Sequence, residues 1–178
     1  MRHPLEAVPH EYRKRFFVTF LVPTLTLLAV FRILDKPLRT SAAPNGIVSF
    51  ELAGSVGQAS AITDEWGNTS HIFAAFGLGI DYLFMPIYAL TLAFGTLLAA
   101  GRHSGWLRSL GTVAGYGAFA AALFDSIENY ALFQILLNRI HSPYPQLAYY
   151  CASIKFGLLL FGIVFALVGW LWPRRSLN

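Results

Sequence analysis

The chain has 178 residues, a length typical of one domain, and 56% of them are hydrophobic while only 12% are charged. A soluble domain usually carries about 25% charged residues, so the composition excludes an ordinary water-soluble protein and favours one embedded in lipid. The formal net charge of +4 comes mainly from Lys and Arg beside apolar segments, which favours membrane lipid over nucleic acid as the partner.

Four long apolar stretches follow one another along the chain, at residues 16–34, 72–100, 110–137 and 147–172. A helix needs about 20 residues to cross a bilayer. Lipid also requires that a spanning segment satisfy its own backbone hydrogen bonds, and none of the stretches alternates in polarity as a strand would. The sequence therefore predicts an all-α membrane protein, a single domain over residues 1–178 built as a four-helix transmembrane bundle.

The longest connection between these stretches, residues 35–71, carries an apolar stripe at spacings of three and four residues. Such spacing is typical of one face of a helix. The members of the stripe are Val48, Leu52, Val56, Ala59, Ile62 and Trp66. We predict one extra amphipathic helix over about 47–66, in the first outer loop, lying on the membrane surface or packed as a lid over the bundle.

Lys and Arg are distributed unevenly between the two sides of the predicted membrane. With four spans, one side carries eight of them: Arg2, Arg13, Lys14, Arg15, Arg102, Arg108, Arg174 and Arg175. The other side carries four: Arg32, Lys36, Arg39 and Arg139. The positive-inside rule therefore predicts cytoplasmic N- and C-termini, and Trp106, Trp170 and Trp172 fall near the same boundary.

Four ionisable residues interrupt the apolar stretches: Asp81 in the second, Asp125 and Glu128 in the third, and Lys155 in the fourth. Each costs about 2.5–3.5 kcal/mol at a helix centre, so such residues rarely face lipid. Counted from the outer helix ends at about 1.5 Å per residue, Asp81, Glu128 and Lys155 lie about 12–14 Å deep and Asp125 about 18 Å. The sequence thus predicts that three helices place charge in one layer.

Helical spacing also gathers these residues on shared faces. Asp125, Glu128 and Asn129 stand at i, i+3 and i+4 and share one face of the third helix. The same helix carries small residues that permit close helix approach, among them Gly111, Gly115, Ala118 and Ala121. On the fourth helix, one face carries Cys151, Lys155, Leu158 and Gly162. We expect these faces to turn inward, forming a ligand-binding or proton-relay site of Asp81, Asp125, Glu128, Asn129 and Lys155.

Three acids and one lysine permit more than one interpretation. As structural pairs, Lys155 neutralises one carboxylate while the other acids are protonated or hydrogen-bonded. Four ionised groups would sum to −2, which is too costly at that depth, so either some acids carry protons, as in relays and general acids, or a cation joins them. Asp81, Asp125 and Glu128 could give an oxygen-rich site for a hard cation. No histidine lies at that depth and Cys151 is the only cysteine, which disfavours zinc and non-haem iron, and we predict neither a metal nor a cofactor.

Four short runs carry a resemblance to known proteins: residues 49–54 (SFELAG), 81–84 (DYLF), 125–129 (DSIEN) and 154–156 (IKF). They resemble a pattern in a family of small bacterial four-span integral membrane proteins. The resemblance covers most of the chain in short motifs, and it implies a bacterial inner-membrane setting but no particular reaction. A four-helix membrane fold with buried acids is also similar to the sterol-isomerase and sigma-2 receptor group, which binds cationic or carbocation-like ligands.

Three functional hypotheses follow from these residues. The first is binding or transport of a small cation or amphiphile by the polar site, with proton coupling left open and the outer helix covering the entrance. The second is an intramembrane lipid-modifying enzyme, with Asp125 or Glu128 as general acid/base and Lys155 as an electrostatic stabiliser. The third is a structural or assembly subunit of a homo-oligomer or larger membrane complex, which co-purification with a stoichiometric partner would favour.

Overall fold

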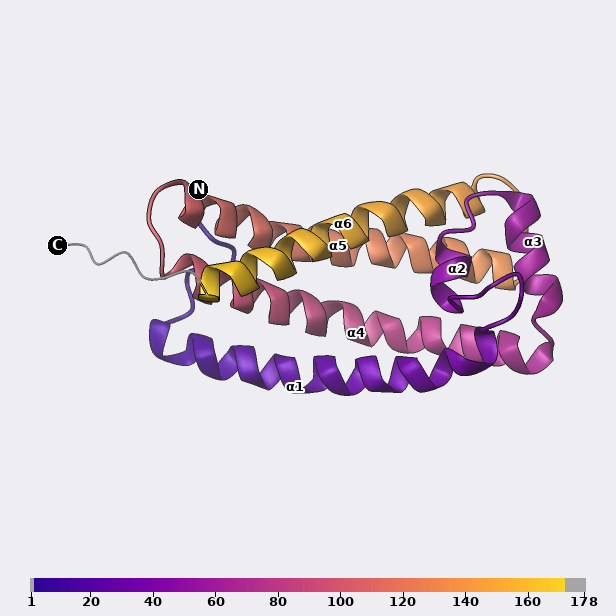
Figure 1. Cartoon of the computed structure of the whole chain (residues 1–178), viewed down its shortest axis with the longest axis horizontal. Helices are drawn as coiled ribbons and strands as arrows, with labels where there is room; N and C mark the ends of the chain where they lie inside the picture. The colour runs from indigo at the N-terminus through magenta and orange to yellow at the C-terminus, as the bar shows by residue number, and fades with distance from the viewer. Residues whose placement is uncertain (1, 172–178) are drawn as a thin grey trace. The chain divides into compact units, whose positions relative to one another are not determined.

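The computed structural model describes residues 2–171, and within this range it contains helices and no strand (Figure 1). The all-α class predicted from the sequence is therefore confirmed for the described residues. The α-helices are α1 (His10–Leu34), α2 (Ile47–Glu51), α3 (Val56–Glu65), α4 (Asn68–Ala100), α5 (Trp106–Leu136) and α6 (Tyr144–Leu171), and a 3-10 turn, η1 (Lys36–Leu38), follows α1. Trp172, Arg174 and Arg175, which entered the orientation argument, lie outside the described residues.

The helices α1, α4, α5 and α6 are long and apolar enough to cross a membrane. They overlap the four predicted apolar stretches, but each begins before its apolar part: α1 by six residues, α4 and α5 by four, and α6 by three. A helix continues through polar residues because its backbone hydrogen bonds do not depend on side-chain polarity. The hydrophobicity of the sequence therefore locates the apolar part of each helix, but not the residue at which the helix begins.

Local sequence explains where α5 ends and α6 begins. Asn138 adopts a positive φ of 61°, its N–H donates to the Ile135 carbonyl, and the Arg139 N–H donates to the Gln134 carbonyl. These bonds make a Schellman motif, which satisfies carbonyls that the last helical turn leaves open. In the first turn of α6, Pro145 is tolerated because no helical N–H is needed there.

The chain divides into two compact units, and each long helix contributes residues to both. The first unit comprises Met1–Thr24, Pro86–Ala122 and Lys155–Asn178, and the second comprises Leu25–Met85 and Leu123–Ile154. Of the predicted site residues, Asp81, Asp125, Glu128 and Asn129 belong to the second unit, whereas Lys155 belongs to the first.

Small residues bring the helices close together in the first unit. A Cβ added at Gly111 on α5 would lie 2.5 Å from the Ala100 Cβ on α4, and one added at Gly162 on α6 would lie 2.7 Å from the Leu92 Cδ2. Glycine at these positions therefore allows the close contact that the sequence predicted. Gly115 differs, since the space beside it is filled by the imidazole of His3 rather than by a helix.

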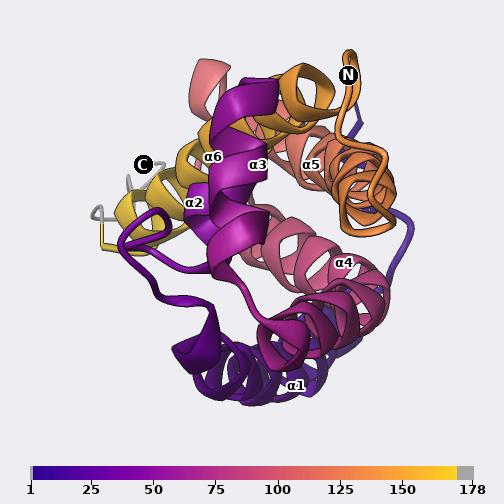
Figure 2. The same ribbon diagram turned by 90° about the vertical axis from the view of Figure 1, so that its right-hand side faces the viewer.

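The core of the second unit joins the segment between α1 and α4 to parts of α4, α5 and α6. Figure 2 looks onto this part of the chain and shows α3 lying across the ends of the longer helices. The buried members of this core are Leu38, Ala43, Phe50, Ala53, Ala59, Ile62, Trp66, Ala74, Leu78, Ala131, Leu132, Ile135 and Ala148. The connection is thus packed onto the helices of its own unit through buried apolar side chains.

The prediction of one continuous amphipathic helix over about 47–66 is wrong, because the segment contains two helices. Gly54 has a φ of +69°, and the Ser55 hydroxyl accepts a hydrogen bond from the Gln58 N–H as the N-cap of α3. Glycine adopts such a φ without steric cost and serine is a favoured N-cap, so local chemistry breaks the helix. The members of the predicted stripe differ in burial, because Val48, Leu52 and Val56 are exposed whereas Ala59, Ile62 and Trp66 are buried.

Two carboxylates hold this segment in place. Asp35 accepts hydrogen bonds from the Ile47 N–H at 2.8 Å and from Arg39 Nε at 3.0 Å, so it caps α2 from outside the helix. Glu65, at the end of α3, accepts from the hydroxyls of Ser41 and Thr40 and from the Ala42 N–H, and these bonds lower its pKa to about 2. The contribution of Glu65 to stability is therefore present above the ordinary pKa of 4.5 and is lost as the pH falls toward 2.

Candidate functional site

Three of the predicted site residues lie on one buried face of α5. Asp125, Glu128 and Asn129 have exposed fractions of only 3%, 0% and 1%. Their spacing of three and four residues places them on the same side of the helix. The structure therefore buries in protein the polar residues that the sequence predicted would avoid lipid.

Asn129 connects this face to α4. Its Nδ2 donates to Asp81 Oδ2 over 2.8 Å and, over a longer 3.4 Å, to the Leu78 carbonyl. Both partners are acceptors, so the amide nitrogen must point toward α4 and the orientation of the side chain is set. The structure thus brings together Asp81, which the sequence assigned to the site from its depth, and Asn129, which it assigned from the helix face shared with Asp125 and Glu128.

A second bond between α4 and α5 lies close to the first, one residue away on α4 and three residues away on α5. The Tyr82 hydroxyl donates to the Ser126 carbonyl over 3.3 Å. Tyr82 follows Asp81 in the sequence and Ser126 follows Asp125, so this bond flanks the acids on the more exposed side of the helix pair. Together the two bonds fix the register of α4 against α5 at the level of the carboxylates.

The remaining polar atom of Asn129 has no assigned donor. Its Oδ1 is buried and makes no hydrogen bond to any group among residues 2–171. A buried carbonyl oxygen left without a donor costs about 1–3 kcal/mol. An N–H or O–H group of a bound molecule or of water would satisfy it.

Lys155 lies on α6 in the first unit, and only 5% of it is exposed. Its Nζ is 4.7 Å from the centre of the Phe156 ring, within cation–π range. Its burial agrees with the expectation that an ionisable residue in an apolar helix avoids lipid. Its grouping with the acids rests on the residue count along the helices and stays a prediction.

The acids are not arranged as a set of metal ligands. Among residues 2–171, no three or more His, Cys, Asp or Glu side chains are grouped so that they could hold a metal ion. What the arrangement offers instead is carboxyl groups beside a carboxamide. Such groups exchange protons and accept hydrogen bonds from a donor.

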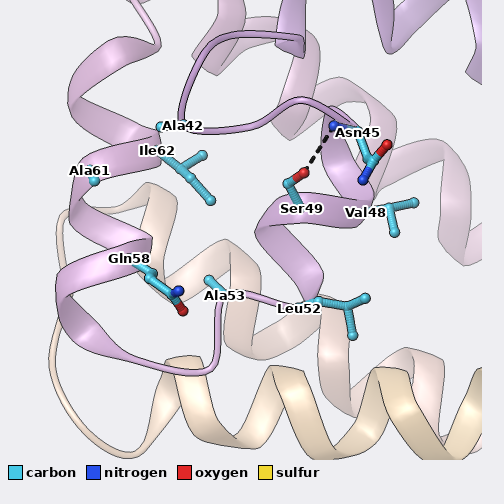
Figure 3. A pocket seen from close by; sticks show the side chains of 9 residues that line it. All are labelled: Ala42, Asn45, Val48, Ser49, Leu52, Ala53, Gln58, Ala61 and Ile62. Carbon is cyan, nitrogen blue, oxygen red and sulfur yellow. Dashed lines mark hydrogen bonds between the residues drawn. The ribbon is translucent and has the colours of Figure 1, made fainter.

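A pocket of about 440 Å³ lies between α2 and α3 in the second unit (Figure 3). Its lining residues are Ala42, Asn45, Val48, Ser49, Leu52, Ala53, Gln58, Ala61 and Ile62. The polar ones, Asn45, Ser49 and Gln58, are uncharged, and the rest are aliphatic or alanine. This lining suits a neutral polar group joined to an apolar one, as in an amphiphile.

The pocket could not be foreseen from periodicity, because one continuous helix over residues 47–66 would leave no space of this kind. The pair Gly54-Ser55 was the available signal, since glycine followed by serine is typical of a break and a new helix start. The backbone N–H of Asn45 donates to the Ser49 hydroxyl over 3.0 Å, which fixes the turn that leads into α2.

Comparisons of the chain with protein-family models, with curated proteins and with solved structures found no match. The resemblance to small bacterial four-span membrane proteins therefore stays a prediction.

Proposed function

We propose that the protein is an integral protein of the bacterial inner membrane, with cytoplasmic termini, that binds or transports a small cation or amphiphile. In this proposal α1, α4, α5 and α6 span the membrane as one bundle. The length and apolar composition of these helices support the first part. The excess of Lys and Arg on one side of the predicted topology supports the orientation.

The observation that carries the functional part is the hydrogen bond from the buried Asn129 to the partly buried Asp81, beside two buried acids. Asp125 and Glu128 lie on the same face of α5 as Asn129 and are 3% and 0% exposed. In an apolar helix each acid costs about 2.5–3.5 kcal/mol. At this cost, three acids grouped between two apolar helices are favoured where they also act on a ligand, and we assign them to binding.

The chemistry of the group favours a ligand that donates hydrogen bonds or carries positive charge. Carboxylates only accept hydrogen bonds, and the buried Oδ1 of Asn129 is a further acceptor. A protonated amine can donate to such acceptors, and a carboxyl group that takes up a proton becomes a donor itself. We therefore include proton exchange with the ligand in the proposal. We also include Lys155 as a counter-charge, only because counting residues along the helices places it at the depth of the acids.

The pocket between α2 and α3 supports the amphiphile part of the proposal. Its uncharged polar residues Asn45, Ser49 and Gln58 stand beside aliphatic ones, so it offers hydrogen bonds to a neutral head and apolar contact to a chain. A lipid-like molecule would meet such a surface at the membrane interface.

The proposal is tested with purified protein in liposomes that contain a pH-sensitive dye. The probes are sodium, potassium, ethylammonium and tetraethylammonium, each added as a gradient. We expect at least one probe to drive proton movement, and we expect Asp81→Asn and Glu128→Gln each to reduce the rate about tenfold or more, equivalent to about 1.4 kcal/mol.

The matched control is Asp64→Asn, which removes an exposed acid of α3 that accepts a bond from Ser60. This variant should transport like the unaltered protein. If Asp81→Asn and Glu128→Gln also retain the full rate, the site does not bind small cations. The same follows if no probe moves protons and none raises the thermal stability of the protein.

A further inference from the structure

The segment that precedes α1, residues 2–9, folds back onto the first unit, and we call it the strap. His3 of the strap is only 5% exposed, and its Nε2 lies 3.3 Å from the Thr96 Oγ1 on α4. On α5, a Cβ added at Gly115 would collide with the imidazole ring. The ring therefore occupies a space that exists because residue 115 has no side chain.

The hydrogen bonds of His3 define its protonation. The Leu5 N–H donates to Nδ1 over 3.2 Å, so Nδ1 carries no proton. The Thr96 hydroxyl donates to the Ala93 carbonyl over 3.0 Å, so it accepts the proton of Nε2. A neutral ring satisfies both contacts, whereas a second proton on Nδ1 would face the Leu5 N–H.

An ion pair and two backbone contacts hold the rest of the strap. Glu6 pairs with Arg108 of α5 at 2.6 Å, and the second oxygen of its carboxylate accepts from the His3 N–H at 3.2 Å. Arg13 of α1 donates to the carbonyls of Glu6 and Val8 at 2.9 and 2.8 Å. Three long helices thus contact the strap, each through a different residue.

We propose that the strap closes the first unit beside Thr96 and Gly115 and that acid releases it, with His3 as the plug and the Glu6–Arg108 pair as the latch. Release would expose the Thr96 hydroxyl and free Arg108 for an anionic group. This inference concerns the first unit alone and does not depend on the proposed function.

The charged groups that face the plug explain the direction of the pH effect. Burial, aided by the Arg13 guanidinium and opposed by the Glu6 carboxylate, lowers the pKa of His3 to about 4. The other groups beside the ring, Thr96 on α4 and Gly115 on α5, do not titrate. Because the folded pKa lies below the ordinary 6.5, the docked state is fully favoured above pH 6.5 and loses stability as the pH falls toward 4.

The latch titrates in a lower range. The hydrogen bond from Arg108 lowers the pKa of Glu6 below its ordinary 4.5. Its contribution therefore stays intact above pH 4.5, and between pH 6.5 and 4.5 only the His3 contribution changes. A pH effect in this window reports on the plug.

The test is hydrogen exchange of the strap amides, followed by mass spectrometry and corrected for the intrinsic pH dependence of exchange. We expect the strap to exchange at least about tenfold slower than an unfolded peptide at pH 7, and to lose much of this protection between pH 6.5 and 4.5. His3→Gln should remove the pH dependence, since glutamine has the same polar reach but does not titrate.

Gly115→Ala tests the fit of His3 against α5 directly, because the added methyl group would displace the imidazole ring. The matched control is Gly117→Ala two residues along α5, whose added Cβ would lie an ordinary 3.5 Å from the Leu158 Cδ2. Gly115→Ala should abolish protection of the strap and Gly117→Ala should keep it. The proposal fails if the strap is unprotected at pH 7, if both glycine variants behave alike, or if His3→Gln retains the pH dependence.

Discussion

Replacing Asn129 with leucine should lower the free energy of unfolding by about 2–3 kcal/mol, although the two side chains have similar volume. Leucine cannot donate to the Asp81 carboxylate or to the Leu78 carbonyl, which lie 2.8 and 3.4 Å from the amide nitrogen. A hydrogen bond to a charged group contributes about 1.5–3 kcal/mol, and leucine at position 129 loses this contribution. Denaturant unfolding in detergent micelles would measure the change.

A double-mutant cycle separates the bond from the general effect of substitution. Asp81→Leu removes the acceptor, so Asn129→Leu added to it should cost less than Asn129→Leu alone. We expect a coupling free energy of about 1–3 kcal/mol between the two positions. If the two losses simply add, the Asn129–Asp81 bond contributes nothing to the pairing of α4 with α5.

Replacing Gly111 with alanine should also destabilise the protein, by about 1–3 kcal/mol. The new methyl group would lie 2.5 Å from the Ala100 Cβ and 2.8 Å from two ring carbons of Phe165. A Cβ is fixed to its backbone, so the clash is relieved only by moving α5 away from α4 and α6. This cost exceeds the gain of about 1 kcal/mol that alanine brings to a helix interior.

Gly117→Ala is again the control, and its effect should have the opposite sign. Since the nearest atom to its added Cβ is 3.5 Å away, only the helix-propensity gain of about 0.5–1 kcal/mol remains. Thermal unfolding of both variants in the same detergent would show the difference. Equal stabilities would mean that the contact between α5 and α4 at Gly111 is looser than the structure indicates.

The four long helices could be predicted from the sequence because each apolar stretch is long enough to leave no other backbone solution in lipid. The break between α2 and α3 could not be predicted from periodicity. The apolar stripe continues at helical spacing through Gly54 and Ser55, and periodicity reports side-chain positions rather than backbone dihedral angles. The turn chemistry of those two residues was the stronger signal.

The candidate site was predictable in part. Counting residues from the helix ends placed Asp81 and Glu128 at similar depth, and helical spacing placed Asn129 on the face of Glu128, but neither determines how α4 is rotated about its axis. The hydrogen bond between Asp81 and Asn129 therefore required coordinates. His3 was missed because its partner Thr96 lies 93 residues away in the sequence, and Gly115 was assigned to helix contact when it in fact makes room for the imidazole.

Infrared difference spectroscopy in lipid nanodiscs would test most directly whether the buried acids of α5 exchange protons and respond to cations. Spectra would be compared between about pH 4 and 9 and with each cation of the transport assay. We expect a weakly hydrated carboxylic-acid band that changes with pH or cation, that is absent from Asp125→Asn or Glu128→Gln, and that persists in Asp64→Asn. Identical spectra from the unaltered protein and both α5 variants would contradict the proposed site, because the acids would then hold one protonation state under all conditions.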